Sequence, residues 1–125
     1  MPNRSLDDVL SELIEERHPP MIELVTAIAR EPFAELLGCD LSMLRLWLGR
    51  SRSDKRHDLM VTYADGRGGG RPTPPFVESF ELTFFGDGHP TQRTADLDGT
   101  IRAIREWYDA VTSGVTGAQF HRDHR

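Results

Sequence analysis

The sequence predicts an α+β domain in which two N-terminal helices precede an antiparallel meander sheet of about four strands and a C-terminal helix packed on that sheet. Three observations support this fold class. Apolar residues recur with helical spacing in the first third of the chain, they alternate with polar residues in the middle, and helical spacing returns near residue 100. Helices and strands are therefore segregated along the chain, which is typical of an α+β fold with one core.

Two helices are expected before residue 40. The first spans residues 5–17, because Ser5 is a suitable N-terminal cap and apolar residues follow it at intervals of three and four. A pair of prolines ends this helix, and Pro20 opens the second one. Pro32 interrupts the second helix, and residues 33–37 are expected to continue it as far as a terminating glycine.

The rest of the chain alternates strand signals with turn residues. Its expected strands are rich in β-branched and aromatic residues, and glycine and proline mark the turns between them. A final helix carries an apolar stripe and begins at an aspartate that can cap it. The expected elements are strands at residues 58–64 and 76–85, a turn at 86–90, a short edge strand at 91–95, and a helix from Asp96 or Asp98 to about Val111.

Residues 41–50 admit two interpretations, and these lead to different functions. Three leucines alternate with Arg45 and Trp47, which is typical of a strand. In a strand with the leucines facing inward, Trp47 faces outward next to Arg45. An exposed tryptophan of this kind is a candidate anchor for a protein interface.

The segment Phe33–Leu48 also resembles a helix-turn-helix motif. Ala34 is a small residue where two helices would touch, Gly38 stands at the turn, and Leu44 and Trp47 would lock the second helix. The resemblance implies a transcriptional regulator that binds DNA. Its recognition face would carry Ser42, Arg45 and Gly49, with the loop Arg67–Arg71 as a wing. That face would also expose leucines, which read base edges poorly, so we favour the strand.

The composition limits the classes of function. The 125 residues suit a single domain, with residues 1–4 and 118–125 expected to be mobile ends. The net charge is −5 and no basic tail is present, which argues against strong nucleic-acid binding and favours a partner with a basic surface. No apolar run is long enough to cross a membrane and no export signal is seen, so we expect a cytoplasmic protein that does not contact a membrane.

We find no pattern that carries catalysis or binds a metal or cofactor. The glycine-rich loop at residues 66–70 lacks the Gly-Lys-Ser/Thr sequence of a phosphate-binding loop. His121 and His124 have no evident further ligands nearby, and the single cysteine, Cys39, is expected to be a small buried apolar residue. We therefore expect a non-enzymatic protein without a cofactor. Two arginines of the glycine-rich loop, Arg67 and Arg71, are candidate partner contacts.

Three segments of the C-terminal half share a pattern. Leu59–Gly66 reads as a strand ending in a turn, Phe84–Asp87 as an aromatic strand end followed by glycine, and Ile101–Tyr108 as a helix. Together they resemble the Imm1-type immunity proteins of bacterial polymorphic toxin systems. The resemblance implies a stoichiometric inhibitor that occludes a toxin, often one that acts on nucleic acid.

An acidic surface would suit the basic rim of such a partner's active site. The candidate acidic residues are Asp65, Glu78, Glu81 and Asp87. The expected function is therefore a protein-binding inhibitor of the immunity or phage anti-defence type. The alternative is a helix-turn-helix regulator of transcription.

Overall fold

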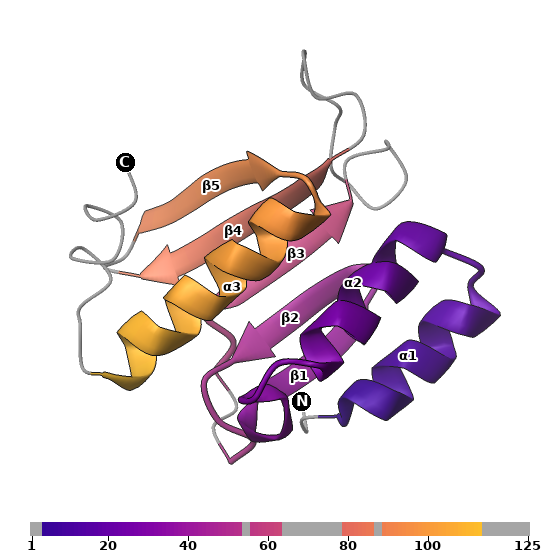
Figure 1. The fold of residues 1–125 in the computed structure, drawn as a ribbon, viewed down its shortest axis with the longest axis horizontal. Helices are drawn as coiled ribbons and strands as arrows, with labels where there is room; N and C mark the ends of the chain where they lie inside the picture. The colour runs from indigo at the N-terminus through magenta and orange to yellow at the C-terminus, as the bar shows by residue number, and fades with distance from the viewer. Residues whose placement is uncertain (1–3, 54–55, 64–78, 87–88, 114–125) are drawn as a thin grey trace.

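An antiparallel sheet with helices on one of its faces forms the fold (Figure 1). It is seen in a computed structural model, which describes residues 4–53, 56–63, 79–86 and 89–113. The elements in chain order are α1 (Leu6–Glu15), α2 (Pro19–Ala29), the 3-10 turn η1 (Ala34–Leu36), β1 (Gly38–Ser42), β2 (Arg45–Gly49), β3 (Leu59–Tyr63), β4 (Phe80–Gly86), β5 (His89–Ala95) and α3 (Leu97–Thr112). The predicted α+β class is confirmed, and the sheet has five strands where about four were expected.

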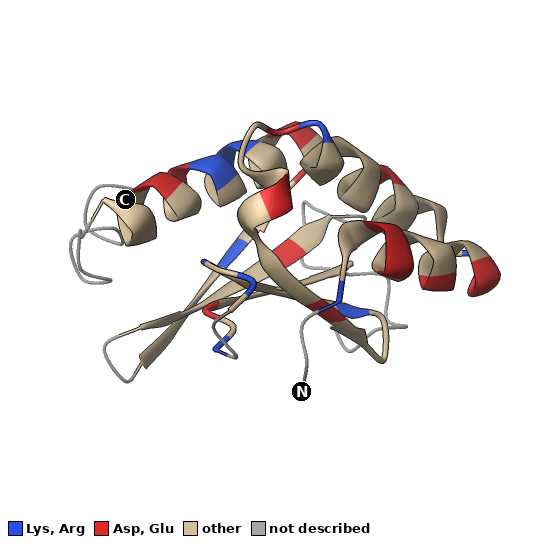
Figure 2. Ribbon diagram, turned by 90° about the horizontal axis from the view of Figure 1, so that it is seen from below, with Lys and Arg blue, Asp and Glu red and all other residues tan. Residues whose placement is uncertain are grey.

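The strands follow one another across the sheet in chain order, each antiparallel to the next. Successive side chains of a strand point to opposite faces, so the register decides what each face carries. Leu46 and Leu48 of β2 are completely buried, whereas Trp47 between them lies on the other face. Seen along the sheet, the helices gather on one side only (Figure 2).

The two N-terminal helices form where their caps predict. The Ser5 side chain accepts a hydrogen bond from the Asp8 N–H at 3.1 Å and caps α1. The buried His18 caps α2, because its Nδ1 accepts the Met21 N–H at 3.3 Å. Pro19 occupies the first turn of α2, where its missing N–H costs nothing. Helix α1 packs on α2 and β1, and α2 packs on β3.

The second helix is shorter than expected. We expected residues 33–37 to continue it to a terminating glycine, but only η1 forms there and Gly38 opens β1. Pro32 has no N–H to donate to a preceding helical carbonyl, which prevents the helix from running on. The Phe33 ring then stacks on Tyr108 of α3, with the ring centroids 4.5 Å apart.

Residues 38–49 form a β-hairpin, so the helix-turn-helix interpretation of this segment is wrong. Only Met43 and Leu44 lie between the last paired residues of the hairpin, and both have positive φ, 53° and 61°. A two-residue loop with positive φ at both positions is the type I′ turn that matches the twist of paired strands. Burial of the inward leucines of β2 outweighs the strain of placing two large apolar residues in that conformation.

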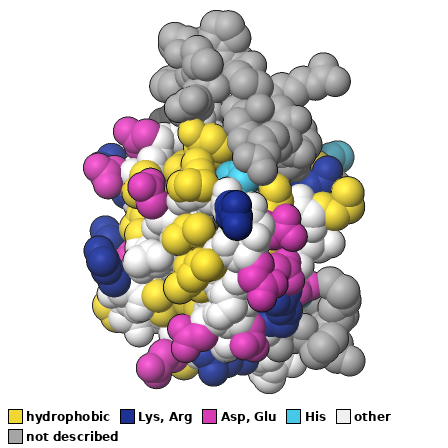
Figure 3. Space-filling model, turned by 90° about the vertical axis from the view of Figure 1, so that its right-hand side faces the viewer, with side chains coloured by type: hydrophobic (Ala, Val, Ile, Leu, Met, Phe, Trp, Pro, Cys, Tyr) yellow, Lys and Arg dark blue, Asp and Glu magenta, His cyan; other side chains and the backbone are white. Residues whose placement is uncertain are grey.

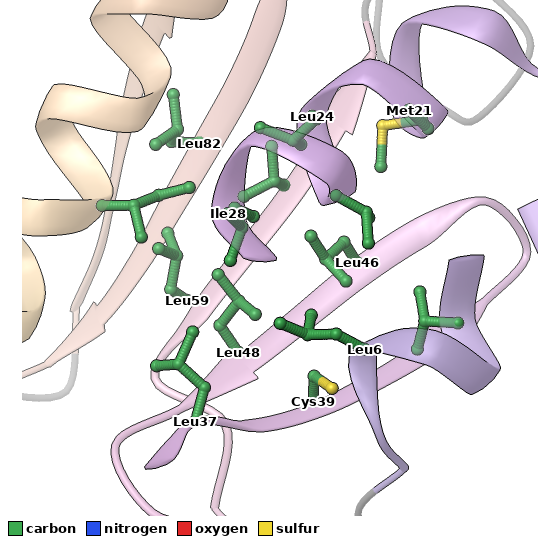
Figure 4. Close-up of a cluster of buried hydrophobic side chains, with 14 of the residues drawn as sticks. Leu6, Met21, Leu24, Ile28, Leu37, Cys39, Leu46, Leu48, Leu59 and Leu82 are labelled. Carbon is green, nitrogen blue, oxygen red and sulfur yellow. The ribbon is translucent and has the colours of Figure 1, made fainter. Parts of the chain in front are cut away.

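The core lies between the sheet and the helices. Leu37, Leu48 and Leu59 lie beside one another beneath Ile28 of α2 (Figure 4). Helix α3 is capped by Asp96, whose carboxylate accepts the Gly99 N–H at 2.8 Å, and it buries Trp107. It packs on β4 and β5, which is the predicted position of the C-terminal helix.

Two further boundaries differ from expectation. The predicted turn at residues 86–90 is mostly strand, because Gly86 ends β4 and pairs with His89 at the start of β5. Arg4 was assigned to a mobile end, but its N–H donates to the Cys39 carbonyl at 2.7 Å and its guanidinium forms an ion pair with Glu12 at 3.1 Å. Over the described part of the chain, no helix is long and apolar enough to cross a membrane.

Candidate functional site

The candidate site is the face of the sheet opposite the helices, which we call the open face. No described helix covers it (Figure 2). One cross-strand row spans all five strands in register, and its members are Asp40, Trp47, Met60, Thr83 and Gln92. This row places a tryptophan and a methionine side by side on the open face, where most such positions are polar.

An aromatic pair is the most distinctive feature of the open face. The rings of Trp47 and Phe85 stack, with centroids 5.9 Å apart and an interplanar angle of 20°. Phe85 is 38% exposed, and Trp47 and Met60 are half-buried. We call these three residues the Trp47 patch. Large rigid rings that carry a polar donor at one end, as the indole does, are the side chains most suited to anchoring a partner.

The loop between β2 and β3 fixes one border of the patch. A Cβ on Gly49 would lie 2.4 Å from the Arg56 carbonyl oxygen, so the loop passes directly over this glycine. The Asp58 N–H donates to the Leu48 carbonyl at 3.0 Å, and the Phe85 N–H donates to the Asp58 carbonyl at 2.8 Å. These bonds hold Phe85 in place from its backbone.

A charge pair reinforces the same border. The guanidinium of Arg50 donates to Asp58 Oδ2 from Nε and Nη2, both at 3.1 Å. Two donors to one carboxylate hold both side chains in a defined geometry. The Trp47 patch is therefore preformed, because its supporting loop is held by hydrogen bonds on both sides.

Two predicted contact residues lie on the open face together with Trp47. Arg45 stands two residues before Trp47 on β2 and is half-buried. Glu81 of β4 is also half-buried and pairs in register with Thr62 and Thr94. The open face therefore carries a cation and an anion, both predicted as contacts, near its apolar patch.

Asp40 lies beside Trp47 and is 97% buried, since only 3% of it is exposed. Its Oδ1 is 3.8 Å from the Arg4 guanidinium, and its Oδ2 has no hydrogen-bond partner. An unpaired buried acceptor costs about 1–3 kcal/mol. Buried polar atoms without a protein partner are rare in native structures, and this one lies next to Trp47.

The structure describes only part of the predicted contact set. Asp65, Glu78 and Asp87, the arginines of the glycine-rich loop (Arg67 and Arg71), and the histidines of the C-terminal segment lie outside the described residues. Phe85 and Met60 were not predicted as contacts. Met60 lies between two buried residues of β3 and Phe85 follows one in β4, but only the tertiary structure shows that both adjoin Trp47.

Two further features of the described residues concern metal binding and surface shape. Among them, no group of three or more histidine, cysteine or acidic side chains is placed to hold a metal ion. A surface hollow of about 440 Å³ lies between α1, α2 and η1, and Asp7, Glu35 and Arg52 are its charged lining residues.

No family model, curated protein or solved structure matches this chain. Its function is therefore inferred from its own residues.

Cys39 is expected to resist thiol reagents in the folded protein. Its side chain is 1% exposed and donates to the Arg4 carbonyl at 2.8 Å, and burial raises the pKa of the thiol from 9.0 to about 11. The protonated thiol is a poor nucleophile. At pH 8, labelling by a disulfide reagent should therefore occur only through unfolding, at a rate that rises steeply with urea.

The same raised pKa has a consequence for stability. Between pH 9 and 11 the folded protein retains a proton that the unfolded chain loses, so this contribution to the free energy of unfolding is complete below pH 9 and disappears toward pH 11. Cys39→Ala should lack this part of the alkaline destabilisation. Rapid labelling of the native protein at pH 8 without urea would contradict the prediction.

Proposed function

We propose that this protein is a non-enzymatic inhibitor that binds a partner protein through the Trp47 patch and blocks the partner's active site or nucleic-acid-binding site. The single observation that carries the proposal is the stacked pair of Trp47 and Phe85 on a sheet face that no described helix covers. Apolar aromatic surface held outside the core lowers solubility unless something binds it. A partner protein that covers these rings would explain why they lie outside the core.

The geometry of the patch favours tight protein binding. The two rings already pack on each other, so little side-chain entropy remains to be lost when a partner binds. Arg45 and Glu81 nearby supply polar contacts at the edge of an apolar centre, which is the usual anatomy of a protein interface. An inhibitor needs only such a stable surface, without moving parts or reactive groups.

The alternative of a DNA-binding regulator loses its main support. It depended on a recognition helix within residues 41–50, and this segment contains the end of β1, the turn and the whole of β2. The resemblance to Imm1-type immunity proteins, by contrast, concerns strands and a helix that are present over the described residues, namely β3, the end of β4 and α3. We therefore propose an inhibitor of the immunity or phage anti-defence type in preference to a DNA-binding regulator.

The proposal is tested by recovering the partner and then removing the patch. Affinity capture from the native host should yield one protein at a fixed stoichiometry. Trp47→Ala should weaken that complex about tenfold or more, measured by isothermal titration calorimetry, because a central interface tryptophan contributes strongly to binding. The recovered partner should lose its activity when the wild-type protein is added in equimolar amount.

A matched control is available in a second stacked pair. Tyr108 is half-buried and stacks on Phe33, but it belongs to α3 on the covered side of the sheet. Tyr108→Ala should leave affinity within about twofold, provided that circular dichroism shows the variant to be folded. Equal loss from both variants, or a salt-sensitive shift of one specific DNA site without any protein partner, would refute the proposal.

A further inference from the structure

Helix α1 has an outer face that no described element covers. Its inner residues, among them Val9 and Leu13, are completely buried against the rest of the core. Leu10 and Ile14 lie one turn apart at the edge of this outer face, where Leu10 is half-buried and packs against the core and Ile14 is 56% exposed. A β-branched aliphatic side chain exposed to this degree contributes little to the core, so its truncation should have a small effect on stability.

The exposed surface of α1 beside this apolar pair is acidic. Residues 5–16 contain five acidic residues and no basic one. Among the described residues, only one of the five takes part in an ion pair, the bridge from Glu12 to Arg4. Figure 3 shows a line of hydrophobic side chains on this side of the molecule with acidic side chains to both sides of it. The unpaired members are Asp7, Asp8, Glu15 and Glu16.

Two of these carboxylates stand where they weaken the helix. Glu15 ends α1 and Glu16 caps it, and the last turn holds no basic residue. The C-terminal end of a helix carries partial negative charge, so anions there are unfavourable. Arg17 follows directly and is the nearest cation in the sequence, but it is outnumbered by the two glutamates. Choices that oppose local stability are typical of binding surfaces.

We propose that the outer face of α1 is a second binding surface, and that it takes a basic amphipathic segment of a protein. Leu10 and Ile14 would contact the apolar side of that segment, and the exposed carboxylates of α1 and its C-terminal cap would pair with its lysine or arginine residues. Charge complementarity selects this occupant, because residues 5–16 expose four acidic side chains outside the ion pair of Glu12 with Arg4 and contain no basic residue. The surface is separate from the Trp47 patch, since α1 lies on the helical side of the sheet (Figure 1). Its failure in a test would leave the proposed inhibitor function untouched.

The probe is a synthetic 14-residue peptide of lysine and leucine in amphipathic helical spacing, titrated into the full-length protein and followed by amide chemical shifts. We expect shift changes concentrated on residues 10–16, and weaker binding in 0.5 M salt. The double variant Glu15→Gln/Glu16→Gln should weaken binding about fivefold, from the loss of two exposed ion pairs. Its melting temperature should be equal or higher, because two carboxylates leave the helix end. A purely structural role for these residues would not raise stability while lowering affinity.

Controls separate this surface from general charge attraction. Asp98→Asn/Asp109→Asn removes two exposed carboxylates from α3 and should leave affinity within about twofold. Ile14→Ser should weaken binding while the protein stays folded, because Ile14 is mostly exposed. The same peptide with glutamate in place of lysine should not bind.

Three results would overturn the proposal. The first is a set of shift changes spread over the whole surface or centred on the Trp47 patch. The second is equal loss of affinity in the α3 control. The third is a concentration-dependent dimer of the wild-type protein that Ile14→Ser abolishes in sedimentation, which would identify a second copy as the occupant.

Discussion

Leu48→Ala is expected to lower the free energy of unfolding by about 3–5 kcal/mol, the largest effect of any substitution considered for this protein. Leu48 is completely buried and lies in β2 between Cys39 of β1 and Leu59 of β3. The truncated side chain would leave a cavity that strands on both sides cannot close without breaking their register. A domain of this size has about 5–15 kcal/mol of stability, so a large part of it would be lost.

Urea unfolding followed by circular dichroism measures this effect. Leu48→Met is the matched control, because it conserves volume and apolar character and should cost less than about 1.5 kcal/mol. A loss below about 1 kcal/mol for Leu48→Ala would mean that β2 does not face the core as described. In that case Trp47, its neighbour on the strand, would not face the open side either.

Gly49→Ala is expected to cost about 3 kcal/mol, at the upper end of the range for overpacked positions. The new Cβ would lie 2.4 Å from the Arg56 carbonyl oxygen, which is a backbone atom and moves only if the whole loop moves. That movement would strain the bond from the Asp58 N–H to the Leu48 carbonyl and the pair between Asp58 and Arg50. Thermal unfolding of the variant and the near-ultraviolet signal of Trp47 report the two consequences.

Gly99 provides the comparison for this substitution. A Cβ there would approach a side-chain oxygen of Asp96 at 3.0 Å and the Ala95 Cβ at 3.1 Å. Side-chain atoms can yield, and alanine gains about 1 kcal/mol of helix propensity over glycine within a helix. Gly99→Ala should therefore change stability by less than about 1 kcal/mol. If both alanine variants were equally stable, the loop could not pass over Gly49 as closely as the structure shows.

The predictions for β2 separate stability from binding on one strand. Leu48 and Trp47 are adjacent in sequence but belong to opposite faces, so the substitution of Leu48 should strongly lower stability, whereas that of Trp47 should spare the fold and weaken the proposed complex. Substitution of Gly49 should affect both stability and binding. The loop that passes over Gly49 also holds Phe85, through the hydrogen bond from the Phe85 N–H to the Asp58 carbonyl.

Local sequence determined the helices, most of the strands and the buried leucines. Spacing of three and four residues marks the inner face of α1, and Ser5 and Asp96 both cap helices as their side chains allow. These features could be predicted because each depends on residues within one or two turns. Alternation likewise placed Leu46 and Leu48 inward and Trp47 outward once residues 45–49 were taken as a strand.

Tertiary structure decided the rest of the candidate site. The turn at Met43 and Leu44 carries no glycine or asparagine, so nothing local announces a hairpin, and the positive φ of both residues is imposed by pairing of β1 with β2. Phe85 adjoins Trp47 across the intervening strand β3, at a distance of 38 positions in the chain. Periodicity shows which way a side chain points, but the register between strands, set by burial of the whole leucine face, decides which side chains meet. The sequence by itself therefore determined an outward tryptophan, and the fold made it part of a patch.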